Sequence, residues 1–192
     1  MTIEKPLRAD ARRNREAIVA AAREVFDAGR FFDMRFDDLA GLAGVGTGTL
    51  YRNFPTREAL AEAVYRSEIV TMSDHARRLG ATRPADQALA TFLRDMVDHI
   101  DTHHGLARTL AALMAAGSRD RNTSGYELEE AVAELVAMGV AQGSLRDDVD
   151  AGAVLMALHG IGAAHARPRW RAEADGVITL VVDGLRRDTA IS

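Results

Sequence analysis

Residues 36–60 read FDDLAGLAGVGTGTLYRNFPTREAL, and the interpretation of the whole chain starts from this stretch. Four apolar residues recur at the i, i+3, i+4, i+7 spacing of one buried helical face: Phe36, Leu39, Ala40 and Ala43. Gly44 follows at once, where a chain that leaves a helix often adopts a left-handed conformation. The stretch therefore predicts a short helix, a tight turn and a second short helix.

The second short helix separates an inner side from an outer side. Leu50 and Phe54 repeat at i+4 on the inner side, which leaves polar residues in outward or edge positions: Thr47, Thr49, Tyr51, Arg52 and Asn53. Hydroxyl, amide and guanidinium groups on an exposed helix suit phosphates and base edges. This pattern is typical of a helix-turn-helix, in which the first helix braces the second in the major groove of DNA.

Residues 43–60, AGVGTGTLYRNFPTREAL, closely resemble the signature of the tetracycline-repressor (TetR) family of transcriptional regulators. The match joins the Ala-Gly-Val turn, Gly-Thr-Leu-Tyr, the Phe and the Thr-Arg-Glu-Ala-Leu entry to a following helix. It covers residues 12–65, with looser support further on. The resemblance implies base contacts for Thr47 and Arg52, and DNA contacts, mostly to phosphate, for the remaining members of the site: Gly48, Thr49, Tyr51, Asn53 and Arg57. Tyr51 has a second interpretation as a half-buried packing residue.

Two positions depart from the family pattern. Arg35 stands near the place where related sequences cap the first of these helices with a small or hydroxyl residue, so Asp33 or a shifted start is expected to serve instead. Gly46 replaces the usual Ser at the N-cap of the next helix. The start of the helix after residues 30–35 is left open.

Composition limits the fold class to all-α. The 192 residues are 47% hydrophobic, and no strand-like alternation is present. Cysteine is absent, which excludes disulfides and thiolate metal sites. The N-terminus lacks a signal-peptide core, and no apolar run reaches membrane-spanning length. A cytoplasmic protein with no membrane partner, associated with the nucleoid when bound to DNA, is expected.

The net charge of −4 is unevenly distributed along the chain. Residues 1–66 carry 11 basic and 10 acidic side chains, whereas residues 67–192 carry 13 and 18. DNA binding would therefore depend on individually placed arginines, not on a strongly basic field. Arg12, Arg13 and Arg15 are expected to face the DNA backbone.

Helical periodicity predicts about nine helices in two domains. The N-terminal helix-turn-helix domain spans residues 1–56, with a loose arm at 1–9 and a first helix from near Ala9 to Ala28. The resemblance implies that the second domain, residues 57–192, binds a ligand and dimerises. Thr56 and Asp150 are expected N-caps, and a capping box of Ser124 with Glu127 predicts a helix start after a polar loop at 117–125.

The last two helices, by resemblance, pair with their copies in a four-helix dimer interface. Its expected members combine small residues of one helix with the apolar face of the other: Ala153, Ala157, Gly160, Ala164, Ile178, Val181, Val182 and Leu185. Packing of the two helices within one chain is the alternative that periodicity leaves open.

The resemblance also implies a cavity for a small-molecule effector in the second domain. Candidate lining residues are Met72, Phe92, Met96, Leu110, Met114, Tyr126, Met138, Met156, His159 and Trp170. Residues of these types are more often ordinary core than ligand contacts. The methionines favour an apolar or aromatic effector. His99 and His103 have an i, i+4 metal-ligand spacing, but no metal or other cofactor is expected because nothing completes a ligand shell.

Catalytic motifs are absent from the sequence: it has no nucleophile elbow, phosphate-binding glycine loop or cysteine nucleophile. The chain is therefore not interpreted as an enzyme. The resemblance implies a homodimeric repressor that an effector releases from a near-palindromic operator. Two alternatives stay open: an activator or co-repressor-dependent regulator of the same build, and a helical small-molecule or metal-binding protein with an idle DNA-binding head. The operator, the regulated genes and the effector are not encoded in these patterns.

Overall fold

The computed structural model describes residues 4–31, 33–103 and 121–187. Within these ranges the named secondary-structure elements are all helices, in agreement with the predicted all-α class. The helices are α1 (Glu4–Asp27), α2 (Phe36–Leu42), α3 (Thr47–Asn53), α4 (Arg57–Thr82), α5 (Ala85–Thr102), α7 (Arg121–Ala141), α8 (Ala151–Ala163) and α9 (Trp170–Leu185). The expected helix with Leu110 and Met114 lies outside the described residues. In the described ranges, no helix combines the length and apolarity needed to cross a membrane.

Several predicted boundaries need correction. α1 begins at Glu4, so residues expected in a loose arm are helical. α2 begins after Arg35, whose backbone is extended and whose side chain makes no capping hydrogen bond. α7 begins at Arg121, so the predicted capping box at Ser124 does not open this helix. Thr56 and Asp150 do act as N-caps. The side chain of Thr56 accepts a hydrogen bond from the amide of Ala59 at 3.2 Å, and that of Asp150 accepts one from the amide of Ala153 at 2.8 Å.

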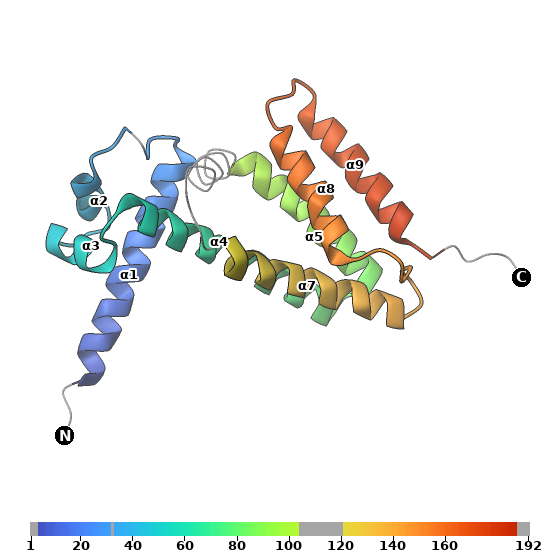
Figure 1. Ribbon diagram of the computed structural model, residues 1–192, viewed down its shortest axis with the longest axis horizontal. Helices are drawn as coiled ribbons and strands as arrows, with labels where there is room; N and C mark the ends of the chain where they lie inside the picture. Colours follow the sequence, from blue (N-terminus) through green and yellow to red (C-terminus); the bar gives the residue numbers. More distant parts are fainter. Residues whose placement is uncertain (1–3, 32, 104–120, 188–192) are drawn as a thin grey trace, which may run out of the picture. The chain divides into compact units, whose positions relative to one another are not determined.

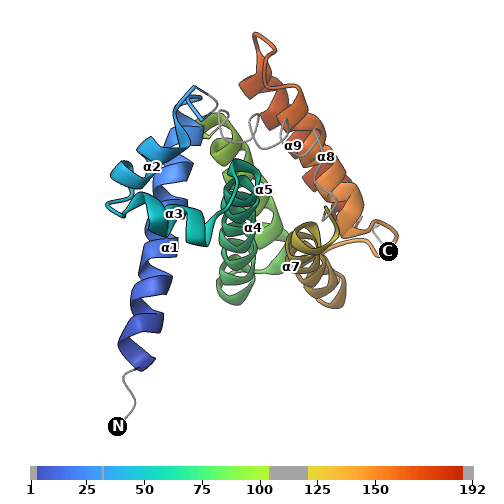
Figure 2. The same ribbon diagram turned by 60° about the vertical axis from the view of Figure 1, so that its left-hand side comes forward.

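The chain divides into two compact units, and the division falls inside α4 between Ser67 and Glu68. In the first unit, α2 and α3 pack on α1 and on each other (Figures 1 and 2). Their shared core is made by the inner faces of these helices and the start of α4: Ile18, Ala22, Val25, Phe26, Phe31, Leu39, Ala40, Leu50, Phe54, Leu60, Ala61 and Val64. The rings of Phe26 and Phe31 stack 3.8 Å apart in this core.

The turn between α2 and α3 depends on a glycine conformation. Gly44 has φ +65°, the left-handed region that the sequence predicted for it. This reversal lets the amide of Val45 donate to the carbonyl of Ala40 at 2.9 Å, which satisfies a carbonyl at the end of α2. The two short helices are thereby joined without a longer loop.

In the second unit, α5 is the central helix and contacts α7, α8 and α9. Its periodic apolar face is buried as expected and includes Leu89, Phe92, Leu93, Met96 and Val97. α9 is tied down near both ends. The indole of Trp170 donates to the carbonyl of Ile161 at 2.6 Å, and an isolated antiparallel bridge joins Leu145 to Arg186.

Candidate nucleic-acid interface

The exposed side of α3 carries the residues that the sequence assigned to DNA. Leu50 and Phe54 are 0% and 1% exposed and hold the inner side of the helix in the core. Gly46 is the N-cap, with an extended backbone and no side-chain hydrogen bond. We call this group the reading surface; it comprises the exposed Thr47, Gly48, Tyr51 and Arg52 and the half-buried Thr49 and Asn53.

Tyr51 connects α3 to the first turn of α2. Its hydroxyl donates a 2.9 Å hydrogen bond to Oδ1 of Asp37, and its ring meets the ring of Phe36 edge to face at 5.4 Å. The pKa of Tyr51 is raised above its ordinary value. The largest cause is the hydrogen bond to the Asp37 carboxylate, and the second is partial burial of the phenol. Tyr51 remains 44% exposed, so the residue is accessible and also has a partner within the protein.

Two more members of the reading surface bond to their own helix. Nε of Arg52 donates to the carbonyl of Gly48 at 2.9 Å, and Nη2 donates to Oγ1 of Thr49 at 3.2 Å. Nδ2 of Asn53 donates to the carbonyl of Thr49 at 2.9 Å. A base or phosphate that binds Arg52 or Asn53 would replace these bonds or use the donors that remain.

Arg57 has a role that the sequence did not indicate. Its guanidinium donates to the carbonyls of Phe31 and Met34 and lies 5.5 and 5.7 Å from the ring centres of Phe31 and Phe36. These contacts fix the connection between α1 and α2. The expected phosphate contact stays a prediction that only the remaining N–H groups of Arg57 could satisfy.

Arg15, which the sequence analysis expected to face the DNA backbone, contacts the end of α3. Its guanidinium lies 4.4 Å from the ring centre of Phe54 and donates to the carbonyl of Asn53 at 3.5 Å. A cation at the carboxyl end of a short helix stabilises the helix dipole. The nearby Arg12 pairs with Glu16 at 3.6 Å on the exposed side of α1. Arg15 therefore supports α3, a role that no local sequence signal distinguishes from a solvated arginine.

The predicted effector-binding residues do not gather in one place. Phe92, Met96 and Trp170 are buried in the core of the second unit, and Met72 and Met138 pack against it. Three others are exposed and do not belong to this core: Tyr126 at 62%, Met156 at 74%, and His159; their part in effector binding stays a prediction. Leu110 and Met114 lie outside the described residues.

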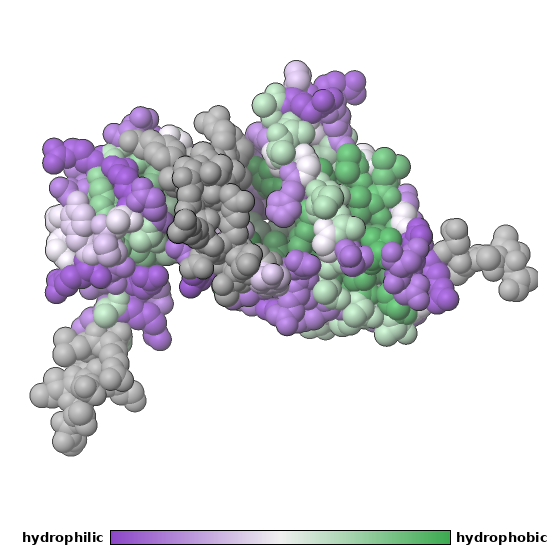
Figure 3. Space-filling view, in the orientation of Figure 1, coloured by the Kyte–Doolittle hydropathy of each residue, from purple (hydrophilic) through white to green (hydrophobic). Residues whose placement is uncertain are grey.

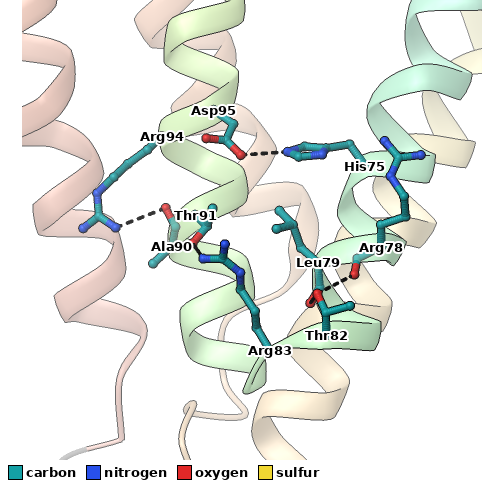
Figure 4. Close-up of polar contacts among 9 residues, drawn as sticks. All are labelled: His75, Arg78, Leu79, Thr82, Arg83, Ala90, Thr91, Arg94 and Asp95. Atoms are coloured by element: carbon teal, nitrogen blue, oxygen red, sulfur yellow. Dashed lines mark hydrogen bonds and ion pairs between the residues drawn. The ribbon is translucent and has the colours of Figure 1, made fainter.

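Polar contacts join α4 to α5 within the second unit (Figure 4). Nε2 of His75 lies 2.8 Å from Oδ2 of Asp95, and Nη1 of Arg83 donates to Oγ1 of Thr91 at 3.1 Å. Further along α5, Nε2 of His99 lies 3.3 Å from Oε2 of the buried Glu68. Among the described residues, no group of three or more His, Asp or Glu side chains has the arrangement of a metal site.

An apolar surface runs along α8 and α9 (Figure 3). We call it the α8–α9 face, and define it by exposed Met156, Val177 and Leu180, which are 74%, 38% and 75% exposed, with the small residues Ala153 and Gly160. Beside it lies a groove of about 370 Å³ lined by Ala157, Gly160, Ile161, Ala164, Arg167, Trp170, Glu173, Ala174 and Val177. Apolar groups that stay exposed on two adjacent helices mark a surface for association.

The predicted dimer residues on α9 need correction. Ile178, Val182 and Leu185 are 1%, 5% and 3% exposed, because they pack into the core of their own unit. Ala153 and Gly160 are exposed, and Ala157, Ala164 and Val181 are half-buried. α9 has apolar residues on two sides, and a shift of one residue turns the helical face by about 100°. Periodicity alone therefore selected the inner side.

Comparison with known proteins covers both units. Residues 18–64 match the family model of the bacterial regulatory proteins of the TetR family, and residues 84–187 match the C-terminal domain of SbtR-like transcriptional regulators. Among curated protein sequences, none matches the chain. The second model spans more than half of the 192 residues.

Solved structures give the same result. The TetR transcriptional regulator SCO0520 from Streptomyces coelicolor is 38% identical, with a TM-score of 0.71 over 91% of this chain and 99% of that one. A TetR regulatory protein from Mycobacterium vanbaalenii is 33% identical, with a TM-score of 0.68 over 95% and 100%. A TetR-family regulator from Pectobacterium atrosepticum, 22% identical over 93% and 97% of the two chains with a TM-score of 0.72, shares the fold. The chain belongs to the TetR family of DNA-binding transcriptional regulators.

Proposed function

We propose that the protein is a homodimeric repressor that leaves its operator when a small molecule binds the second unit. The observation that carries this proposal is the α8–α9 face, because 75% of Leu180 and 74% of Met156 stay exposed on a surface that a second copy can cover. Two copies present two reading surfaces, as a near-palindromic operator requires.

The contacts of α3 support a direct role in DNA recognition. Arg52 is exposed and carries a planar donor group that suits the acceptor edge of guanine. Thr47 and Gly48 are exposed beside it, so the backbone and a hydroxyl can approach phosphate closely. The contacts of Arg15 would keep α3 in position while it is in the groove, and those of Arg57 would hold the connection between α1 and α2.

For the effector we propose an apolar or aromatic small molecule in the second unit. Phe92, Met96 and Trp170 supply aromatic and polarisable side chains to its core. Release requires that the effector bind the DNA-incompatible state more tightly than the DNA-bound state, since equal affinity would leave the equilibrium unchanged.

Fluorescence anisotropy with the DNA immediately upstream of the protein's own gene tests the function. We expect binding that survives competitor DNA and weakens log-linearly with salt. Arg52→Ala should cost about 1–3 kcal/mol and relax specificity at one base pair. If the wild-type protein binds this DNA no better than random DNA, genome-wide capture is the next test, and failure to capture any specific site would reject the function. If Arg52→Ala binds the operator with unchanged affinity, Arg52 does not contact a base.

Sedimentation velocity tests the dimer. Leu180→Glu places a charge on the α8–α9 face and should raise the dimer dissociation constant at least about tenfold. Ala81→Glu, at an exposed position of α4, is the charge-matched control and should leave association unchanged. A Leu180→Glu protein that associates like the control would exclude this face as the interface.

A further inference from the structure

Asp37 is a charged residue beside the reading surface that no expected DNA contact includes. It lies in the first turn of α2, and its side chain is 45% exposed. Its Oδ1 accepts the Tyr51 hydroxyl proton at 2.9 Å, and its Oδ2 lies 3.9 Å from Nη2 of Arg35, a side chain that is 80% exposed. A carboxylate is thus the immediate partner of a residue expected to meet phosphate.

The two partners compete for the same proton. A phenol hydroxyl has a single hydrogen to donate, so a hydroxyl bonded to Asp37 cannot also donate to a phosphate oxygen. A phosphate that approaches Tyr51 would in addition come close to the negative charge of Asp37, and like charges repel. The bond seen here and a Tyr51–phosphate bond therefore exclude each other.

The surroundings favour the bond to Asp37 in the free protein. The ring of Tyr51 packs edge to face on Phe36, the residue before Asp37, which keeps the hydroxyl near the carboxylate. The raised pKa of Tyr51 has the Asp37 hydrogen bond as its largest cause, in agreement with this geometry. Charge-assisted hydrogen bonds of this kind are stronger than neutral ones.

We propose that Asp37 is a positioning residue that holds the Tyr51 hydroxyl in the free protein and must release it before Tyr51 donates to a DNA phosphate. This inference rests on the proposed function, since it requires α3 to bind DNA. Asp37 thereby lowers DNA affinity through Tyr51, and it reduces binding to any duplex because phosphate contacts carry no sequence information.

A double-mutant cycle of Asp37→Ala and Tyr51→Phe tests the proposal with the full-length protein. Dissociation constants are measured for the operator and for random-sequence duplex at low salt. We expect Asp37→Ala to tighten binding of both duplexes about three- to tenfold when Tyr51 is present. In the Tyr51→Phe background, the same substitution should have an effect at least about threefold smaller, because no hydroxyl is left to release.

Asp37→Ala also releases Arg35 from its ion pair with Asp37. Because this happens in both backgrounds, any effect of Arg35 on DNA affinity cancels in the cycle. Asp37→Asn keeps an acceptor for the hydroxyl without the charge, and should tighten binding less than Asp37→Ala. Circular dichroism and thermal melting confirm that the variants are folded, and Asp38→Ala, at the exposed neighbouring position, is the matched control.

Two outcomes overturn the proposal. Equal tightening in both backgrounds would mean that Asp37 acts by general repulsion of DNA, and weaker binding by Asp37→Ala would mean that it only supports α3. Failure of the proposed function has another signature. If operator and random duplex bind equally while the cycle keeps its coupling, the specific function is wrong and the role of Asp37 stands. Specific binding of the operator with no coupling would instead keep the function and remove the role of Asp37.

Discussion

The reading surface and the α8–α9 face are both exposed, but their chemistry before binding differs. On the reading surface, the hydroxyl of Tyr51, Nε and Nη2 of Arg52, and Nδ2 of Asn53 already have hydrogen-bond partners. On the α8–α9 face, Leu180 and Met156 leave most of their apolar surface exposed in a single subunit. Binding at the first surface exchanges hydrogen bonds, whereas binding at the second removes water from apolar area.

This difference predicts different responses to solution conditions. Exchange of charged hydrogen bonds with DNA phosphates should depend steeply on salt. Association through the α8–α9 face should depend weakly on salt and show a negative heat-capacity change. Substitutions can separate the two surfaces from the cores that support them.

The core under the reading surface should give the largest effect. Phe54→Ala removes a side chain that is 1% exposed, and should lower the free energy of unfolding by about 3–5 kcal/mol. Urea denaturation followed by circular dichroism measures the change. Leu42→Ala, at a position that is 58% exposed, is the control and should stay within about 0.5 kcal/mol. Similar values for the two would mean that Phe54 does not anchor α3.

Two neighbours on α9 should behave in opposite ways. Ile178→Ala removes a group that is 1% exposed, and should cost about 2–4 kcal/mol of unfolding free energy at any protein concentration. Leu180→Ala removes one that is 75% exposed, so its effect should appear only at concentrations where the dimer forms. Denaturation at two protein concentrations, tenfold or so apart, makes the comparison. A concentration-independent loss for Leu180→Ala would place Leu180 in the core of one subunit.

Two glycines near the turn between α2 and α3 should give smaller changes in stability, of opposite sign. Gly44 has φ +65°, so Gly44→Ala should cost about 1–2 kcal/mol through backbone strain. Gly41 lies within α2, and an added Cβ would meet nothing within 4 Å. Gly41→Ala should therefore stabilise the protein by about 0.5–1 kcal/mol. Thermal melting of both variants checks the prediction, which fails if the two shifts have the same sign.

The smallest effect is a pH dependence of the Tyr51–Asp37 bond. The hydrogen bond to Asp37 raises the pKa of Tyr51 in the folded protein. Its contribution is therefore fully present below the pKa of Tyr51 in the unfolded chain and is lost as pH rises through the folded value. The difference in unfolding free energy between wild type and Tyr51→Phe should stay constant up to about pH 9 and shrink as the pH rises above about 10. A difference that stays constant would mean that this bond is not formed in solution.

The sequence predicted what local rules control. The buried stripe of α2, the left-handed Gly44, the N-caps Thr56 and Asp150, and the apolar face of α5 all follow from spacing or from one residue's backbone preference. These features need no knowledge of distant residues. The predicted start of the first helix near Ala9 was wrong, since α1 begins at Glu4.

The capping box at Ser124 is a local rule that failed, since α7 begins at Arg121. The other errors concern contacts between residues far apart in the chain. Arg57 bonds to the carbonyls of Phe31 and Met34, and a sequence gives no sign of which arginine reaches which carbonyl. On α9, Ile178 and Leu180 are equally apolar, and only the packing of α5 and α8 decides that the first lies inside. For the same reason Tyr126 and Met156 were assigned to an interior that they do not enter.

The contacts that hold both ends of α9 have a consequence for how two subunits associate. The Trp170 indole bond at its start and the Leu145–Arg186 bridge at its end hold the helix in one register. Its outer side chains are thus presented on a backbone that is already ordered, so little conformational entropy is lost when the face is covered. Subunit encounter should therefore behave as docking of preformed surfaces: second-order kinetics, with no slow unimolecular phase after mixing.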